Sequence, residues 1–123
     1  MPSKEGFFYR LLMSYTTRIA WETLRTIDSA TFTGAKQAVG TPLVHPSYIL
    51  KLVNASSVLV TISIDGVNDV DVAPANSFFL YDEGKVGLSS AMPALPAGTQ
   101  IYVTGAVAGT GLVYLVSQYI VTN

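Results

Sequence analysis

The sequence has 123 residues, of which 50% are hydrophobic and only 12% are charged, and it contains no cysteine. The length fits one domain, and the lack of cysteine excludes a disulfide scaffold and thiolate metal sites. The formal net charge of −1 argues against a general attraction to nucleic acid. No apolar run reaches the roughly 20 residues that a membrane span needs.

The apolar content is high for a protein that exists alone in water. The mean hydropathy is +0.42, and a soluble monomer usually carries about 25% charged residues, roughly twice the fraction found here. Because the apolar surplus does not form a membrane span, we expect neighbouring protein subunits to cover it. The composition therefore predicts a building block of an assembly, with other copies of the same chain among its partners.

Residues 1–16 are predicted to form an N-terminal arm, extended or in a short helix, before a single domain over residues 17–123. Loop-forming residues open the arm and large apolar side chains follow, which are costly to leave in water. Such an arm either packs against its own domain or inserts into a neighbouring subunit. We predict that the arm and the strand after it make subunit contacts through Phe7, Phe8, Tyr9, Leu11, Leu12, Trp21 and Arg25.

The first half of the domain is rich in β-branched residues. The segment 18–28 fits either a strand or a helix, whereas 31–39 predicts a strand with a bend at Gly34. A loop that contains Pro42 and Pro46 follows, because each proline favours extended geometry in the residue before it. Residues 47–54 then predict a strand that is apolar on both faces.

The clearest strand pattern covers residues 58–65, where apolar and polar side chains alternate with only Leu59 out of phase. Asp65 and Gly66 predict a tight hairpin turn into a return strand that contains Val70 and Val72. A strand over 77–81 and a loop over 83–98 are expected next.

The last part of the chain predicts a strand over 99–105, a hairpin turn over 106–111 and a final strand over 112–121. The final strand is apolar on both faces, which places it at the centre of a sheet or at a subunit contact. About eight short strands with glycine and proline turns between them predict an all-β fold. We expect an antiparallel β-sandwich or a jelly-roll-like domain.

The residues that could carry chemistry do not form a known motif. His45 is the single histidine, and no nucleophile motif accompanies it, so we interpret it as structural. Asp65, Asn68, Asp69 and Asp71 are close together but lack the spacing of a calcium-binding loop, and we interpret them as a turn and a polar strand face. We therefore expect no enzymatic activity, no cofactor and no metal.

Several segments resemble small virion proteins of tailed bacteriophages. They are Gly34–Pro46, Leu52–Ser56, Val60–Gly66, Pro74–Asp82, Pro96–Val103 and Gly111–Leu115, and together they cover most of residues 18–120. The resemblance implies a non-enzymatic structural subunit of the virion, assembled in the host cytoplasm. Its place would be at the capsid surface, as a decoration protein, or in the head–tail neck. Its partners would be other copies and the major capsid, portal or neck proteins, without direct contact to nucleic acid or membrane.

An alternative hypothesis starts from the tyrosines. Tyr81, Tyr102 and Tyr114 would form an exposed platform on which a sugar ring can stack. The chain would then be a carbohydrate- or receptor-binding β-sandwich module of a phage tail.

Overall fold

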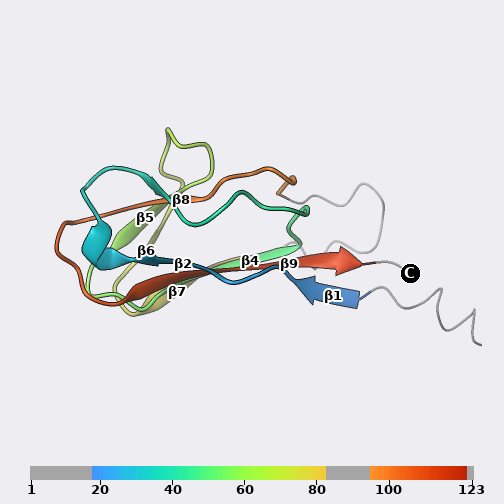
Figure 1. Cartoon of the computed structure of the whole chain (residues 1–123), viewed down its shortest axis with the longest axis horizontal. Helices are drawn as coiled ribbons and strands as arrows, with labels where there is room; N and C mark the ends of the chain where they lie inside the picture. The colour runs from blue at the N-terminus through green and yellow to red at the C-terminus, as the bar shows by residue number, and fades with distance from the viewer. Residues whose placement is uncertain (1–17, 83–94, 122–123) are drawn as a thin grey trace, which may run out of the picture.

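The computed structural model describes residues 18–82 and 95–121, which form two antiparallel β-sheets packed against each other (Figure 1). Sheet A contains β1 (Arg18–Trp21), β2 (Arg25–Asp28), β4 (Ile49–Asn54), β7 (Ser77–Asp82) and β9 (Leu112–Val121). Sheet B contains β3 (Gln37–Ala38), β5 (Val60–Ser63), β6 (Asp71–Ala73) and β8 (Tyr102–Gly105). The all-β sandwich expected from the sequence is thus confirmed.

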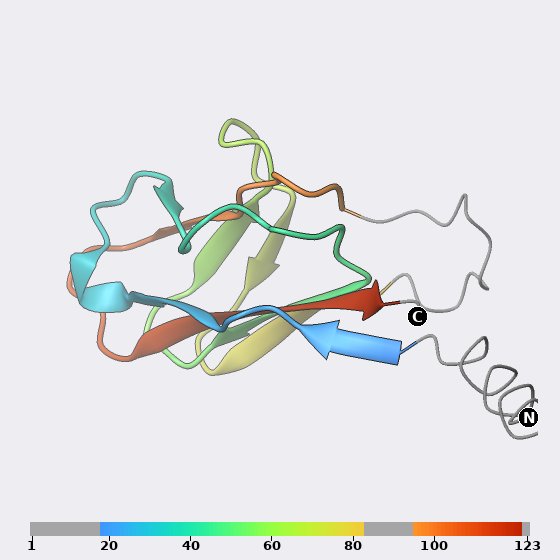
Figure 2. The same cartoon turned by 45° about the vertical axis from the view of Figure 1, so that its right-hand side comes forward.

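The ten-residue strand β9 is the centre of sheet A. It pairs with β4 along one side and with both β1 and β2 along the other, and β7 forms the far edge beyond β4 (Figure 2). A strand that carries apolar residues on both faces suits this central position. Of the two placements expected for residues 112–121, the structure shows the centre of a sheet.

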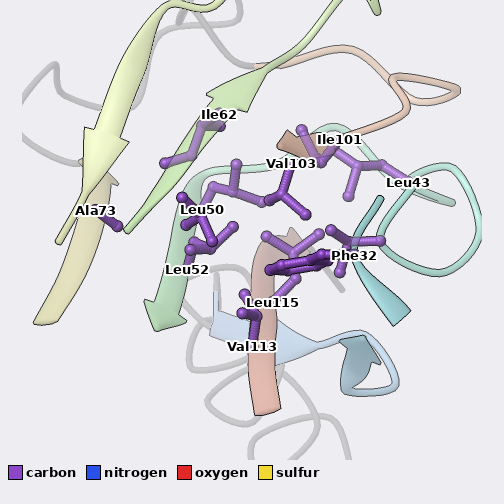
Figure 3. Close-up of a cluster of buried hydrophobic side chains, with 12 residues drawn as sticks. Phe32, Leu43, Leu50, Leu52, Ile62, Ala73, Ile101, Val103, Val113 and Leu115 are labelled. Carbon is purple, nitrogen blue, oxygen red and sulfur yellow. The ribbon is translucent and has the colours of Figure 1, made fainter. Parts of the chain in front are cut away.

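The core lies between the two sheets and is built from alternate residues of each strand (Figure 3). In β4, Leu50 and Leu52 face inward, and in β9 Val113 and Leu115 do the same. A side chain of this size contributes about 1.5–3 kcal/mol when it is fully buried. The full set of buried apolar residues is Phe32, Val39, Leu43, Leu50, Leu52, Val60, Ile62, Ala73, Ile101, Val103, Val113 and Leu115.

The expected strand over 31–39 is wrong for most of its length. The chain forms a short 3-10 helix, η1 (Ser29–Thr31), because the Asp28 carboxylate accepts a hydrogen bond from the Ala30 amide at 3.0 Å. A left-handed Gly34 (φ +85°) then turns the backbone again. Only the two residues of β3 pair with β8. The ambiguous segment 18–28 resolves as two strands, β1 and β2, that share β9 as a partner.

Two expected hairpin turns are also different. Residues 64–70 form a longer loop between β5 and β6 in place of a tight turn at Asp65 and Gly66. Residues 106–111 connect β8 in sheet B to β9 in sheet A, so they cross between the sheets and are not a hairpin. Gly111 is left-handed (φ +94°) and lies so close to the Ala55 carbonyl that a Cβ atom has no room. Glycine is therefore required at position 111, where the chain crosses between the sheets.

Candidate functional site

The side of sheet A that faces away from sheet B forms a continuous surface, which we call the outer face. In β9 the buried residues Val113, Leu115 and Ser117 point inward, so the residues between them point outward. Residues directly opposite each other on paired strands share a face. The strand registers therefore place on the outer face Ile19, Trp21, Thr26, Asp28, Ile49, Lys51, Val53, Phe78, Leu80, Leu112, Tyr114, Val116, Gln118 and Ile120, and the β7 register sets Asp82 opposite Ile49.

Large apolar side chains dominate the outer face. Trp21 is 62% exposed, Phe78 is 61% exposed and Leu80 is 49% exposed. The corresponding side of sheet B is more polar, since Thr61 lies there between its cross-strand neighbours Thr104 and Val72. Antiparallel sheets usually place polar residues on the side that meets water. The outer face breaks that pattern, as interaction surfaces do.

A groove of about 430 Å³ lies at one end of the outer face, between β4 and β7. Its lining is Lys51, Val53, Asn54, Ala55, Asn76, Ser77 and Phe78. Lys51 is half-buried there, yet the ion pairs among the described residues join Arg25 to Glu22, Lys36 to Asp69 and His45 to Glu22. Lys51 therefore offers an ammonium group, without a carboxylate partner among the described residues, beside an apolar surface.

A second polar cluster surrounds Glu22, at the break between β1 and β2. The Glu22 side chain is only 3% exposed, and its carboxylate accepts hydrogen bonds from Arg25 Nη2 at 2.8 Å and from the His45 amide at 2.7 Å. The Val44 amide also donates to it, at 3.2 Å. Burial raises the pKa of Glu22, but the hydrogen bonds from Val44, His45 and Arg25 outweigh burial and hold that pKa below its usual value.

The Arg25 guanidinium and the His45 ring of this cluster contact groups of the same chain. Arg25 Nε donates to the Thr41 carbonyl at 2.8 Å, and Arg25 Nη2 donates to the Pro42 carbonyl at 2.9 Å. The His45 ring lies 3.1 Å from Glu22 Oε2 through Nδ1 and stacks on Tyr119 with 3.7 Å between ring centroids. The cluster thus fastens the 41–45 loop to the edge of sheet A. This arrangement agrees with the structural interpretation of His45.

The acidic side chains of residues 65–71 do not gather at a common site. The Asp65 carboxylate accepts hydrogen bonds from the Asn68 and Val67 amides at 2.8 and 2.7 Å, which hold the pKa of Asp65 well below its usual range. Asp69 pairs with Lys36 at 2.9 Å. Among the described residues, no three acidic or histidine side chains gather closely enough to hold a metal ion. Asp65 instead organises its own loop.

The three tyrosines of the alternative hypothesis lie in different places. Tyr114 is on the outer face of sheet A, Tyr102 is on sheet B with its ring close to Gly66, and Tyr81 packs against the core. They do not form a single stacking platform.

The predicted contact residues divide into three groups. Trp21 is exposed on the outer face, whereas Arg25 is buried within its own domain. Phe7, Phe8, Tyr9, Leu11 and Leu12 lie outside the described residues. The sequence analysis did not single out Phe78 and Leu80, because residues 78–81 are apolar throughout and show no alternation that separates exposed from inward side chains.

The chain matches no protein-family model, and searches of curated proteins and of solved structures also give no match. Among the described residues, no helix has the length and apolar character needed to cross a bilayer.

Proposed function

We propose that this chain is a non-enzymatic structural subunit that packs on other protein subunits through the outer face of sheet A. One observation carries the proposal: a sheet face with Trp21, Phe78 and Leu80 largely exposed. Burying a side chain such as Phe78 or Leu80 contributes about 1.5–3 kcal/mol. A subunit contact that buries these side chains gains this free energy, whereas an isolated domain that leaves them in water does not.

We further propose that the assembly is the virion of a tailed bacteriophage, at the capsid surface or in the head–tail neck. The resemblance of several segments to small virion proteins supports this place. The low charge of the chain, 12% of its residues, also supports it, because a virion subunit has neighbours on several sides. The subunit would reinforce or join neighbouring virion proteins.

The test measures incorporation into particles of the virus that encodes the chain. The variant Trp21→Ser/Phe78→Ser makes the outer face polar, and the control Val67→Ser/Val107→Ser changes two exposed valines outside that face. Quantitative mass spectrometry of purified particles should find the wild-type chain and the control at equal occupancy. We expect the outer-face variant to fall to about a tenth of that occupancy or less, given its lost burial.

Two results would contradict the proposal. One is the absence of the wild-type chain from purified particles. The other is normal occupancy of an outer-face variant whose fold is intact by circular dichroism. Deletion of residues 1–16 in the same assay tests the arm, which we expect to be needed for incorporation as well.

A further inference from the structure

Strand β7 is a free edge of sheet A. It pairs with β4 on one side, and no described strand pairs with its other side. The remaining edges are shorter: β3 and β6 have two and three residues, and the edge opposite β7 is divided between β1 and β2, of four residues each. β7 has six residues and contains neither the proline nor the lysine that commonly protects an exposed edge. It is therefore the edge best suited to pair with a further strand.

The hydrogen bonds of β4 determine which backbone groups of β7 are free. The Ala55 amide donates to the Leu112 carbonyl at 3.1 Å, so Ala55 bonds towards β9. Successive residues of an antiparallel strand bond to opposite sides, so Asn54 bonds towards β7, where it lies opposite Ser77. Ser77 and every second residue after it therefore bond to β4. The residues between them direct their amide and carbonyl groups to the free edge.

Phe78 and Leu80 are two of these edge-directed residues, and their side chains are exposed as well. Phe78 is 61% exposed and Leu80 is 49% exposed. Unpaired backbone groups next to exposed apolar side chains are what a strand offers when it pairs with a strand of another chain. The two residues lie one position before and one position after Phe79, so the free groups are placed symmetrically about Phe79.

We propose that β7 pairs with β7 of a second copy of this chain, antiparallel, about a two-fold axis at Phe79. The rotation sets Phe78 opposite Leu80 of the partner subunit and Leu80 opposite the partner's Phe78. Each of these two pairs exchanges two backbone hydrogen bonds, because all four residues direct their backbone groups to the edge. Sheet A then continues from one copy into the next, and the exposed side chains of Phe78 and Leu80 contact each other across the axis.

The edge favours a second copy over a strand of another protein. Pairing between two copies uses both free edges at once, whereas an added foreign strand leaves an open edge of its own. The register also brings no like charges together, since Asp82 comes opposite Asn76 of the partner subunit. The inference goes beyond the proposed function, because it concerns the edge of sheet A and not packing on the outer face.

The experiment is disulfide cross-linking of the full chain, which contains no cysteine of its own. Phe78→Cys and Leu80→Cys are mixed at high micromolar concentration and oxidised, and mass spectrometry counts the mixed and the like dimers. Residues 78 and 80 of a bonded pair lie about 5.5 Å apart at Cα, which a disulfide can bridge. Equal residues lie about 9 Å apart, too far for a disulfide. We expect mixed dimers to exceed like dimers about tenfold.

Val107→Cys is the matched control, because Val107 is 65% exposed and lies in the crossing between β8 and β9, away from β7. Mixed with Leu80→Cys, it should cross-link no more than the like dimers do. Mixed dimers of Phe78→Cys and Leu80→Cys at that same low level overturn the inference, and so does a preference of Leu80→Cys for itself.

A second measurement tests the backbone groups directly. In sedimentation velocity at high micromolar concentration, wild type and Leu80→Val should dimerise, because valine keeps the amide at position 80. Leu80→Pro should stay monomeric, because it removes an amide directed to the edge, where proline is tolerated. A wild-type chain that stays monomeric, or a folded Leu80→Pro variant that dimerises like wild type, contradicts the pairing. The proposed function is tested separately, by whether particles lose the Trp21→Ser/Phe78→Ser variant.

Discussion

At the residue scale, the Glu22 side chain is buried and held by several hydrogen-bond donors. A buried carboxylate is costly unless several donors surround it. Here the donors come from β2 and from the 41–45 loop, so one residue joins segments about twenty positions apart. The lowered pKa of Glu22 reports that the folded state favours the charged form. Its charge is therefore part of the fold and not a reactive group.

Replacing Glu22 with glutamine should remove this charge and lower the free energy of unfolding at neutral pH by about 2–3 kcal/mol. Because the folded-state pKa of Glu22 is lowered, the wild-type contribution is fully present above about pH 4.3, the ordinary value. It is lost as the pH falls from there through the folded-state pKa. The gap between wild type and Glu22→Gln should therefore narrow on acidification, in urea unfolding measured at several pH values.

Asp69→Asn is the control for this measurement, because the Asp69–Lys36 pair is partly exposed. Surface pairs contribute about 0–1 kcal/mol, so the control should change little. If the free energy of unfolding of Glu22→Gln differs from that of wild type by the same amount at every pH, the charge of Glu22 does not contribute to stability.

At the element scale, Asn54 ends β4 and ties it to the opposite layer. Its side chain is fully buried, and Nδ2 donates to the carbonyls of Val58, Ala73 and Pro74 at 2.8, 2.9 and 3.1 Å. Oδ1 accepts from Ser56. One amide therefore satisfies the backbone of two turns, at the point where the chain leaves sheet A for β5 and where it returns after β6.

Asn54→Ala should lower the free energy of unfolding by about 3 kcal/mol, because it removes the hydrogen bonds that a fully buried amide makes to three carbonyl groups and to Ser56. Chemical denaturation followed by far-ultraviolet circular dichroism measures this loss. Asn68→Ala is the matched control, since Asn68 is an exposed loop residue bonded to Asp65, and it should cost less than about 1 kcal/mol. An equal decrease in the free energy of unfolding in the two variants would show that the burial of Asn54 does not increase its contribution to stability.

Local sequence patterns predicted some strands correctly and misidentified other segments. Strands β7 and β9 could be predicted, because each contains a continuous apolar run, Phe78–Tyr81 in β7 and Leu112–Val116 in β9. The segment 31–39 misled the analysis, because its β-branched residues do not reveal that Asp28 caps a turn or that Phe32 must enter the core. The crossing at 106–111 was read as a hairpin, since glycines mark a turn but not which sheet receives the next strand.

The candidate site was predictable only in part. The low charge and the surplus of apolar residues indicated an uncovered surface, and Trp21 was named as a contact residue. Its position required the strand register, which brings Trp21, Phe78 and Tyr114 from distant segments onto one face. Arg25 is buried against groups of its own chain, which the sequence does not mark, because its partner Glu22 lies three residues away across a break between strands.

At the scale of the whole molecule, the two sheets differ in what they present to their surroundings. The outer face of sheet A carries Trp21, Phe78 and Leu80, whereas the corresponding side of sheet B carries Thr61 and Thr104 beside Val72 and Tyr102. The outer face of sheet A is therefore the side on which we expect a neighbouring subunit to pack. Trp21 provides a direct measure of that cover, because it is the single tryptophan of the chain.

The emission of Trp21 should report when the outer face becomes covered. In dilute wild-type protein we expect emission at long wavelength and strong quenching by acrylamide, because Trp21 is 62% exposed. As the concentration rises and a partner covers the face, the emission should shift to shorter wavelength and quenching should weaken. Phe78→Ser should keep the long-wavelength emission over the same range, because it makes the outer face more polar, whereas Val67→Ser should follow wild type. Emission that is already at short wavelength in dilute monomer would mean that the chain covers its own outer face, and the need for a neighbouring subunit would disappear.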